Sequence, residues 1–343
     1  MIDFPSSPSV GQIFTAAGAS WRWDGTKWVA YGGGSSGDVG RNLIHNPLFN
    51  IQQRGAGPWT LTSVYTADRW IMGFTGGTMS TQITAMTDAN RTTIGDDAAV
   101  SQLAMTVAGG SGATDVSYMD HSIEDLHRTG GKTVTLSFWA AATAGTPKIG
   151  LALFQVFGTG GSPSGIVSIT SQAVTISTTW TRYTATFNVP TIVGKTFGTA
   201  GDSKLIVRFA LSAGATASAS YGGIAVQSAT FMLWGIQLES GSVATPLEKP
   251  DPQQDLAKCQ RFYQTGSFWN LGYNNAGLDC GVTYPFPVVF RATPTITPTT
   301  TVNSNCAVAN ALYILPSSWV PHTIATATNA INLQGTFTAS ADL

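Results

Sequence analysis

Residues 41–248 constrain the fold more than any other part of the 343-residue chain, because they form one long series of short strand-like stretches. Stretches rich in Val, Ile, Thr and aromatic residues alternate with clusters of Gly, Ser and Thr that favour turns. In one such stretch, Val134, Leu136 and Phe138 fall on the same face of an extended chain. About ten strands at this spacing, without helices of the βαβ kind between them, predict a two-sheet sandwich of the jelly-roll type.

The low proportion of charged residues limits the partners of the chain. Charged residues make up 10% of the sequence and the formal net charge is -1, whereas an ordinary soluble protein has about 25% charged residues. A nucleic-acid-binding surface needs a basic face that neutralises phosphates, so we expect no nucleic-acid partner. The many β-branched and small polar residues instead favour extended β structure with neutral surfaces.

The cysteines and the first residues carry no signal for a metal site or for export. Cys259, Cys280 and Cys306 are widely spaced, odd in number and without a Cys-x-x-Cys pair. We therefore expect no disulfide framework, no metal site and no cofactor. The first residues lack a basic region and an apolar run, and no stretch of about 20 apolar residues occurs. We expect no signal peptide, no membrane insertion, and synthesis in a cytoplasm.

Residues 20–31 hold the densest aromatic cluster of the chain and predict a β-hairpin. The pair Asp24-Gly25 is a strong turn signal between two short aromatic stretches. Whether the loop has two residues or four, Trp21, Trp23 and Trp28 fall on one face of the hairpin. A lone hairpin cannot bury such a face within itself.

Two interpretations of this aromatic face remain open. In the first, Phe4, Ile13 and Phe14 close a small core over it. In the second, the three tryptophans and Tyr31 dock residues 1–31 on a larger assembly. Residues 32–40 are rich in Gly and Ser and predict a flexible linker between this segment and the rest of the chain.

A change of character near residue 250 begins the last part of the chain, residues 251–343. Asp251 as N-cap and Pro252 in the first turn predict a short helix that runs to Tyr263. The apolar positions of this helix recur at helical spacing and form one stripe. The stripe consists of Leu256, Cys259, Phe262 and Tyr263.

After Phe262 the sequence is almost neutral and predicts a β tip domain. Only Asp279, Arg291 and Asp342 carry charge there. A neutral β segment exposes strand edges and apolar patches that invite pairing with other chains. Symmetric self-association covers such surfaces, so we expect a homotrimer in which the helical stripe faces copies of itself.

Residues 41–55 (RNLIHNPLFNIQQRG), followed by residues 65–70 (YTADRW), are the most distinctive stretch of the chain. Together they resemble the opening of a module common in tail fibres and related virion appendages of tailed bacteriophages. Residues 11–12 and 21–28 are similar to a short repeat at the N-termini of phage fibres. Further stretches that resemble the module follow in the same order, at residues 134–140, 180–190, 236–248 and 256–263.

The resemblance implies a non-catalytic virion structural protein, assembled in the host cytoplasm and usually trimeric. It implies that residues 41–250 form a jelly-roll domain of the carbohydrate-binding kind and that residues 1–31 contact other virion proteins. Host surface polysaccharide is then the expected partner. The whole chain is expected to be all-β, with an N-terminal docking hairpin, a two-sheet sandwich and a C-terminal β tip.

Aromatic residues in loop-like settings are the candidates for sugar contacts. Sugar sites combine flat apolar walls with a few polar groups for hydroxyls. Trimer contacts would use the same aromatic residues in the tip, and the sequence leaves this alternative open. Trp70, Trp139 and Trp234 lie beside aliphatic residues and are assigned to the core. The glycan-binding candidates are Trp59, Tyr65, Trp269, Tyr273, Asn274, Trp319 and His322.

The polar cluster His121, Glu124, Asp125 and His127 is the strongest enzyme-like pattern, and we interpret it as a surface turn. On a helix over residues 121–128, His127 would point away from the face shared by His121 and Asp125. The acidic residues near positions 96–97 and 115–120 could hold Ca²⁺, but we favour solvated turns as their explanation. The catalytic site is therefore expected to be absent.

The sequence favours a phage fibre or adhesin that attaches the particle to host surface glycan. Two alternatives stay open. One is a purely structural neck, collar or capsid decoration protein. The other is a tail-associated glycan hydrolase, which would need a carboxylate pair in a chain that has only 18 Asp and Glu residues.

Overall fold

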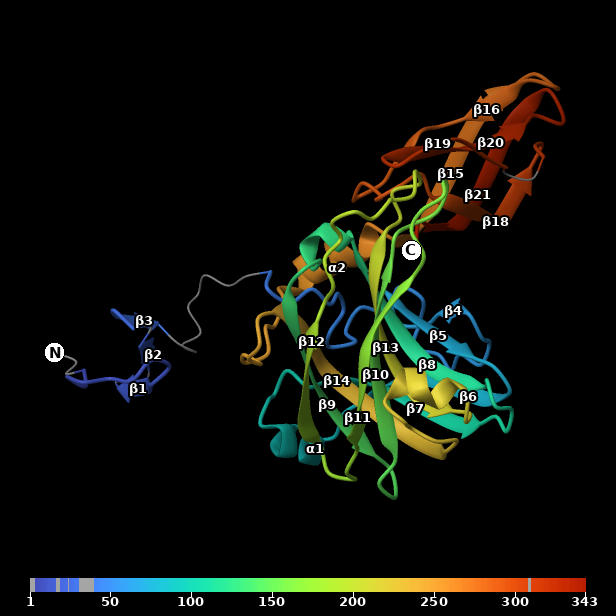
Figure 1. Cartoon of the computed structure of the whole chain (residues 1–343). Helices are drawn as coiled ribbons and strands as arrows, with labels where there is room; N and C mark the ends of the chain where they lie inside the picture. Colours follow the sequence, from blue (N-terminus) through green and yellow to red (C-terminus); the bar gives the residue numbers. More distant parts are fainter. Residues whose placement is uncertain (1–3, 17–18, 24, 31–39, 308–309) are drawn as a thin grey trace.

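The computed structural model describes residues 4–16, 19–23, 25–30, 40–307 and 310–343, which form an all-β protein in three parts (Figure 1). A small N-terminal sheet comes first, then a two-sheet sandwich, then a C-terminal pair of sheets. Paired strands are antiparallel in all three parts, for example β1 with β2, β8 with β13, and β15 with β21. The all-β class and the sandwich predicted from the strand spacing are confirmed.

The N-terminal sheet has three strands in the order β1-β2-β3. Trp23 pairs with Trp28, which corresponds to the four-residue loop. The sequence predicted a hairpin, and β1 adds a third strand to it. The bounds are β1 (Ile13–Ala16), β2 (Ala19–Trp23) and β3 (Trp28–Ala30).

The sandwich consists of a six-stranded and a five-stranded sheet, whose order is β11-β10-β13-β8-β5-β4 and β12-β9-β14-β7-β6. The six-stranded sheet contains β4 (Val64–Tyr65), β5 (Trp70–Phe74), β8 (Val116–Glu124), β10 (Lys148–Val156), β11 (Val167–Thr175) and β13 (Lys204–Ala213). The five-stranded sheet contains β6 (Gly77–Ala85), β7 (Ser101–Gly109), β9 (Thr133–Ala142), β12 (Thr181–Asn188) and β14 (Ser228–Ser240).

The main core lies between these two sheets. Val134, Leu136 and Phe138 of β9 are fully buried there, as their alternation predicts. Trp70 of β5 is buried with them. Trp234 is buried on the other side of the five-stranded sheet, in a smaller cluster that includes Ile94, and Trp139 is only half-buried against this cluster.

The described residues also form short helices, namely α1 (Asp88–Ile94), η1 (Leu126–Arg128), η2 (Ala217–Tyr221) and α2 (Pro252–Gln260). The helix α1 was not predicted, although Thr87 caps its N-terminus and Gly95 ends it in the left-handed conformation. The helix α2 begins as predicted, because the carboxylate of Asp251 accepts hydrogen bonds from two backbone amides of the first turn.

The interpretation of residues 121–128 as a helical turn is wrong for residues 121–124. β8 extends to Glu124, and only Leu126–Arg128 turn into the 3₁₀-helix η1. His121 shares the buried face of β8 with Met119 and Ile123. The polar residues between them hid the alternation, so the buried histidine looked like part of a surface turn.

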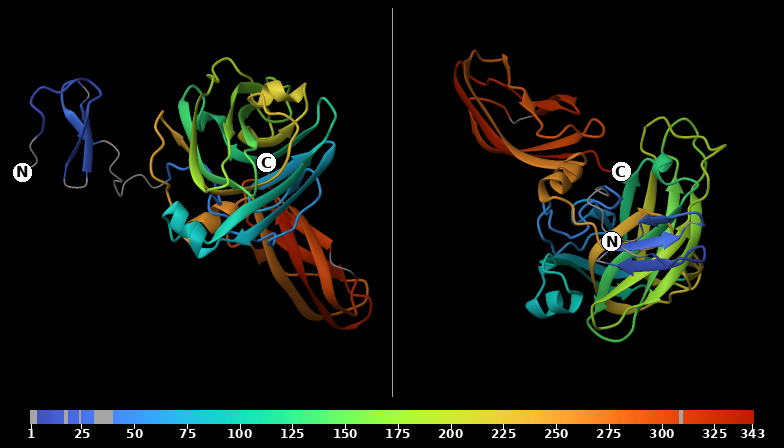
Figure 2. Two further views of the ribbon diagram at one scale, coloured as in Figure 1. Left: turned by 90° about the horizontal axis from the view of Figure 1, so that it is seen from below. Right: turned by 90° about the vertical axis from the view of Figure 1, so that its left-hand side faces the viewer.

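The tip follows α2 and consists of two small sheets that project from one end of the sandwich (Figures 1 and 2). One sheet has the order β15-β21-β18 and the other has β16-β20-β17, with β19 also paired to β20. Their bounds are β15 (Tyr263–Asn274), β16 (Asp279–Gly281), β17 (Tyr284–Pro285), β18 (Thr295–Ser304), β19 (Asn310–Leu315), β20 (Ser318–Ile324) and β21 (Asn329–Ser340).

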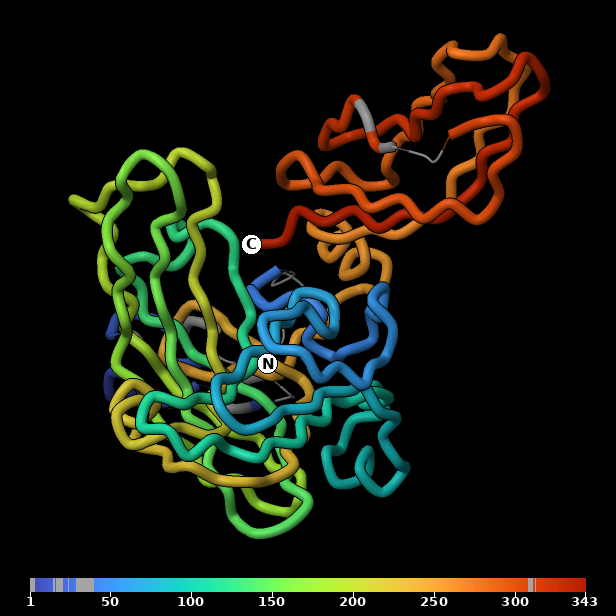
Figure 3. Tube along the Cα trace, turned by 90° about the vertical axis from the view of Figure 1, so that its right-hand side faces the viewer, coloured from blue at the N-terminus to red at the C-terminus, as the bar shows by residue number. Residues whose placement is uncertain are grey.

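The last residues return from the tip to the sandwich (Figure 3). The carboxylate of Asp342 forms an ion pair with Arg54, and the Tyr65 hydroxyl donates to the backbone oxygen of Leu343 at 2.6 Å. The Ala341 amide donates to the carbonyl of Phe262 at 2.8 Å. The tip is therefore held to the sandwich at both ends of its chain segment.

Candidate functional site

A row of large apolar side chains lies exposed on β15 in the tip. Because successive strand residues point to opposite faces, Trp269, Leu271 and Tyr273 share one face, where 58%, 56% and 72% of their surfaces are exposed. Phe268 and Asn270 point the other way and are buried. We call Trp269, Leu271 and Tyr273 the β15 row.

A hollow of about 300 Å³ adjoins the β15 row at Trp269. Hydroxyl and amide groups of neighbouring strands surround it, so a ligand there would meet polar groups beside an aromatic ring. Its lining includes Ser267, Trp269, Tyr284, Thr301, Gln334 and Thr336.

Tyr284 holds the backbone of β15 in place beside this hollow. β15 is an edge strand of its sheet, and the amide of Trp269 donates to the Tyr284 hydroxyl at 2.6 Å. The same hydroxyl donates to the carbonyl oxygen of Trp269. Both polar groups of an exposed edge residue are thus satisfied, which fixes the backbone that carries the indole ring.

The other tip candidates do not join Trp269 and Tyr273. The interpretation of Trp319 as an exposed ring is wrong, because it is fully buried in the tip core, with its centroid 5.0 Å from that of Phe337. The amide nitrogen of Asn274 donates to the backbone oxygen of Asp279 at 3.1 Å. The Nε2 atom of His322 lies 3.2 Å from an oxygen of the same aspartate's carboxylate.

Trp59 and Tyr65 lie on the sandwich and also stay apart from the β15 row. Trp59 is half-buried against the sandwich core, and its backbone pairs with Thr81. The Tyr65 hydroxyl is bound to Leu343, and burial, followed by the charge of Asp342, raises the pKa of Tyr65 to about 12. The expectation that these rings are exposed together in a loop is wrong for Tyr65, whose ring lies in the junction with the tip.

Most of the predicted oligomer stripe is buried within the chain. The helix does not run to Tyr263 as predicted, because α2 ends at Gln260, Phe262 follows it and Tyr263 begins β15. Phe262 and Cys259 are almost completely buried, and the guanidinium of Arg69 lies 3.3 Å from the centroid of the Phe262 ring. Leu256 is half-buried. The guanidinium carbon of Arg54 lies 3.6 Å from the centroid of the Tyr263 ring. The prediction that the stripe faces copies of itself is therefore wrong for Cys259 and Phe262, and for the half-buried Leu256 it stays a prediction.

The N-terminal aromatic residues pack on one another. Phe4 stacks on Trp28 with a centroid distance of 5.5 Å and meets the edge of Trp21 at 5.2 Å. Phe14 contacts the same two rings, while Ile13 is 50% exposed. This geometry favours the small core closed by Phe4 and Phe14. Tyr31 and most of the predicted linker lie outside the described residues.

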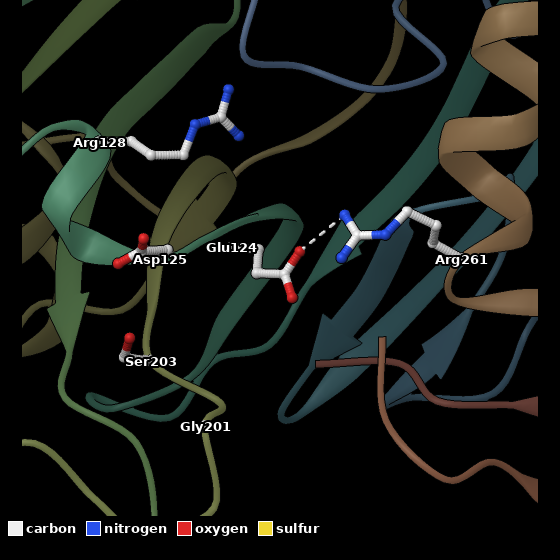
Figure 4. Close-up of a pocket in the computed structure, with 6 residues that line it drawn as sticks. All are labelled: Glu124, Asp125, Arg128, Gly201, Ser203 and Arg261. Atoms are coloured by element: carbon white, nitrogen blue, oxygen red, sulfur yellow. Dashed lines mark ion pairs between the residues drawn. The ribbon is translucent and has the colours of Figure 1, made fainter. Parts of the chain in front are cut away.

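A second hollow lies where the sandwich meets α2 (Figure 4). Its volume is about 460 Å³, and charged side chains from both parts line it. Sequence reasoning found Glu124 and Asp125 but missed the arginines, because they come from η1 and from the end of α2. The lining consists of Glu124, Asp125, Arg128, Gly201, Ser203 and Arg261. We call this hollow the junction pocket.

The acidic residues considered for Ca²⁺ are engaged in local hydrogen bonds and ion pairs. An Asp96 oxygen lies 2.8 Å from Lys249 Nζ, and the Asp115 carboxylate accepts from the Gly112 amide at 2.7 Å. Arg208 forms two hydrogen bonds to Asp120, at 2.7 and 2.8 Å. Within the described residues, no group of three or more His, Cys, Asp or Glu side chains could hold a metal ion. The helices of this part of the chain include none long and apolar enough to cross a membrane.

Several solved structures are similar to part of the chain at low sequence identity. A putative sugar binding protein from Bacteroides thetaiotaomicron is 13% identical over 58% of this chain and all of its own, with a TM-score of 0.38. A family 11 carbohydrate-binding module from Clostridium thermocellum, in complex with a β-1,3-1,4-mixed-linked tetrasaccharide, is 12% identical over 56% of this chain and 99% of its own, with a TM-score of 0.32.

A third similar structure is the enzymatically active domain of tailspike protein 4 from bacteriophage CBA120. It is 13% identical over 59% of this chain but only 22% of its own length, with a TM-score of 0.32. No protein-family model and no curated protein sequence matches the chain.

Proposed function

We propose that this protein is a non-catalytic fibre or adhesin of a bacteriophage particle, which binds a host surface polysaccharide through its tip. The observation that carries the proposal is the β15 row beside the polar hollow of the tip. The resemblance of residues 41–55 and 65–70 to phage appendages supports the same role. The position of the protein on a virion and its homotrimeric state stay predictions.

The β15 row has the physical properties of a sugar-stacking surface. A tryptophan or tyrosine side chain buries about 150–250 Å² when it is covered, at roughly 25 cal/mol per Å² of apolar surface. Leaving such rings exposed on an edge strand is unfavourable unless a partner covers them. The C–H faces of a pyranose ring fit a flat aromatic side chain, and the hydroxyls of the sugar can bond to Ser267, Thr301 and Gln334 in the hollow.

Replacing Trp269 or Tyr273 with alanine should weaken binding to host polysaccharide about tenfold each, because each change removes a stacking surface. Full-length variants are tested on a glycan array and by calorimetry with the host polysaccharide. Tyr313→Ala is the matched control, since this 78% exposed aromatic residue lies in the other sheet of the tip. Unchanged melting temperatures would show that these surface changes leave the fold intact.

The same experiment separates the alternatives. If the full-length protein binds no glycan on the array or on host polysaccharide, a structural neck, collar or decoration role replaces the adhesin. If the polysaccharide is shortened and sugar is released, the hydrolase alternative replaces it. If Tyr313→Ala weakens binding as much as Trp269→Ala does, the β15 row is not the binding surface.

We also propose that the N-terminal sheet attaches the protein to other virion proteins. Because Phe4 and Phe14 cover the tryptophans, the sheet has a small core of its own and would dock as a preformed unit. Deleting residues 1–31 should abolish incorporation into particles while leaving glycan binding unchanged. Particle composition measured by quantitative mass spectrometry tests this, and normal occupancy of the shortened protein would refute the docking role.

A further inference from the structure

The junction pocket is formed by segments that are distant in the sequence. The end of β8 supplies Glu124, the next residues supply Asp125 and Arg128, the loop before β13 supplies Ser203, and Arg261 follows α2. Its volume of about 460 Å³ is sufficient for a sugar residue, since ligand sites begin at about 300 Å³. Figure 4 shows Arg128 and Arg261 on opposite sides of the space, with Glu124 between them.

The carboxylate of Glu124 is fully engaged by arginines. One oxygen lies 3.0 Å from Arg261 Nη1 and the other lies 3.2 Å from Arg291 Nε. Arg291 also donates to the backbone oxygen of Gly201, at 2.7 Å. Two guanidinium groups therefore share one carboxylate, which leaves a positive excess at this side of the pocket.

The carboxylate of Asp125 is engaged by its own turn. It accepts from the His127 amide at 2.9 Å and lies 2.6 Å from Nδ1 of the same histidine. Burial alone would raise the pKa of Asp125, but the hydrogen bonds from His127 outweigh it and hold the pKa below its ordinary value. Asp125 is thus an anion with a local partner, in a left-handed conformation (φ 67°) that fixes its position.

Arg128 is the arginine of this lining that forms no ion pair among the described residues, and its charge acts on Asp125 only at longer range. Its side chain is exposed and extends toward the open space (Figure 4). The lining holds two guanidinium groups, Arg128 and Arg261, and two carboxylates, Glu124 and Asp125, and Arg291 adds a third positive charge beside Glu124. A guanidinium presents two parallel N–H donors that match a carboxylate, and such pairs are strong when partly shielded from water.

We propose that the junction pocket binds the carboxylate of an acidic sugar, with Arg128 as its anion-binding residue and the Ser203 hydroxyl as a further hydrogen-bonding group. This inference rests on the proposed glycan-binding function and names the class of sugar. A monoanionic carboxylate suits one unpaired guanidinium, whereas a phosphate dianion would place its second charge close to Glu124 and Asp125.

The test uses the full-length protein and calorimetric titration with three probes: tetragalacturonate, its carboxyl-reduced neutral counterpart, and inorganic phosphate. We expect tetragalacturonate to bind at least tenfold more tightly than the neutral tetrasaccharide. Arg128→Gln should reduce this binding at least tenfold, because it removes a charged hydrogen-bonding pair.

Lys148→Gln is the matched control, since it also removes one positive charge from the sandwich. Lys148 begins β10, whose other end pairs with Lys204 beside the pocket. The nine residues of β10 place its two ends about 26 Å apart, at a rise of about 3.3 Å for each step along the strand. Lys148→Gln should leave the affinity for tetragalacturonate unchanged, and unchanged melting temperatures would exclude misfolding of either variant.

Three results would overturn the inference: equal affinity for the charged and neutral tetrasaccharides, unchanged binding by Arg128→Gln, or phosphate binding as tight as that of tetragalacturonate. The last would make the pocket a general anion site. Trp269→Ala separates this test from that of the proposed function. If Trp269→Ala leaves host polysaccharide binding intact while Arg128→Gln abolishes tetragalacturonate binding, the tip proposal fails and the junction pocket stands.

Discussion

Replacing Trp70 with alanine should lower the free energy of unfolding by about 3–5 kcal/mol, because it empties a large volume in a closed core. Trp70 is fully buried in β5. Its ring centroid lies 5.4 Å from that of Phe49, 4.9 Å from that of His121 and 6.1 Å from that of Phe209. The indole therefore joins the segment before β4 to β8 and β13 of the six-stranded sheet, and its loss removes all three contacts at once.

Urea denaturation of the full-length protein measures this loss, with Trp139→Ala as the control. The sequence assigned Trp139 to the core together with Trp70, but the structure leaves it half-buried on the outer side of the five-stranded sheet. Its truncation should cost less than half as much as that of Trp70, because less surface is uncovered. Equal losses in the free energy of unfolding for Trp70→Ala and Trp139→Ala would contradict the placement of Trp139 outside the main core.

Lowering the pH from 7 to 5 should destabilise the protein through two enclosed histidines. His121 is fully buried, and its Nε2 accepts from the His45 amide at 3.2 Å. Burial, followed by the charge of Arg69, lowers the pKa of both histidines well below 6.5. Below about pH 6.5 the unfolded chain therefore binds more protons than the folded chain, and stability falls by up to about 1.4 kcal/mol per pH unit for each histidine.

Urea denaturation at pH 7, 6 and 5 tests this dependence, and His121→Gln should reduce its slope even though the variant is less stable. Burial raises the pKa of the Asp68 and Asp255 carboxyls, which act in the opposite direction when the pH falls toward their range. Comparing the slope of stability against pH between the unaltered protein and His121→Gln separates the contribution of His121 from that of the two carboxyls. A stability that stays constant between pH 7 and 5 would refute the prediction.

The parts of the fold set by local chemistry could be predicted from the sequence. Alternation within strands identified the sandwich, and Asp251 with Pro252 located the start of α2. Trp319 shows where this reasoning stops. It lies in β20, where Pro321 and His322 interrupted the expected strand pattern, although alternate residues of that strand are buried. Its burial depends on packing between the two sheets of the tip, which no local pattern encodes.

The candidate site could be predicted only in part, for the same reason. Trp269 and Tyr273 were identified by their amide-rich surroundings, and strand periodicity could have added Leu271. The position of Tyr284 against the backbone of Trp269 and the meeting of Arg261 with Glu124 depend on tertiary contacts. A single sequence contains no signal for such pairs.

The return of the last residues to the sandwich has a mechanical consequence. If the tip were joined to the sandwich only through α2, a pulling force would break the contacts between tip and sandwich one after another. Here the chain enters the tip beside Phe262 and leaves it through Asp342 and Leu343, which are fastened to Arg54 and Tyr65. Tension on the tip is therefore divided between two parallel attachments that must yield together, which the proposed attachment role would require of a tip under load.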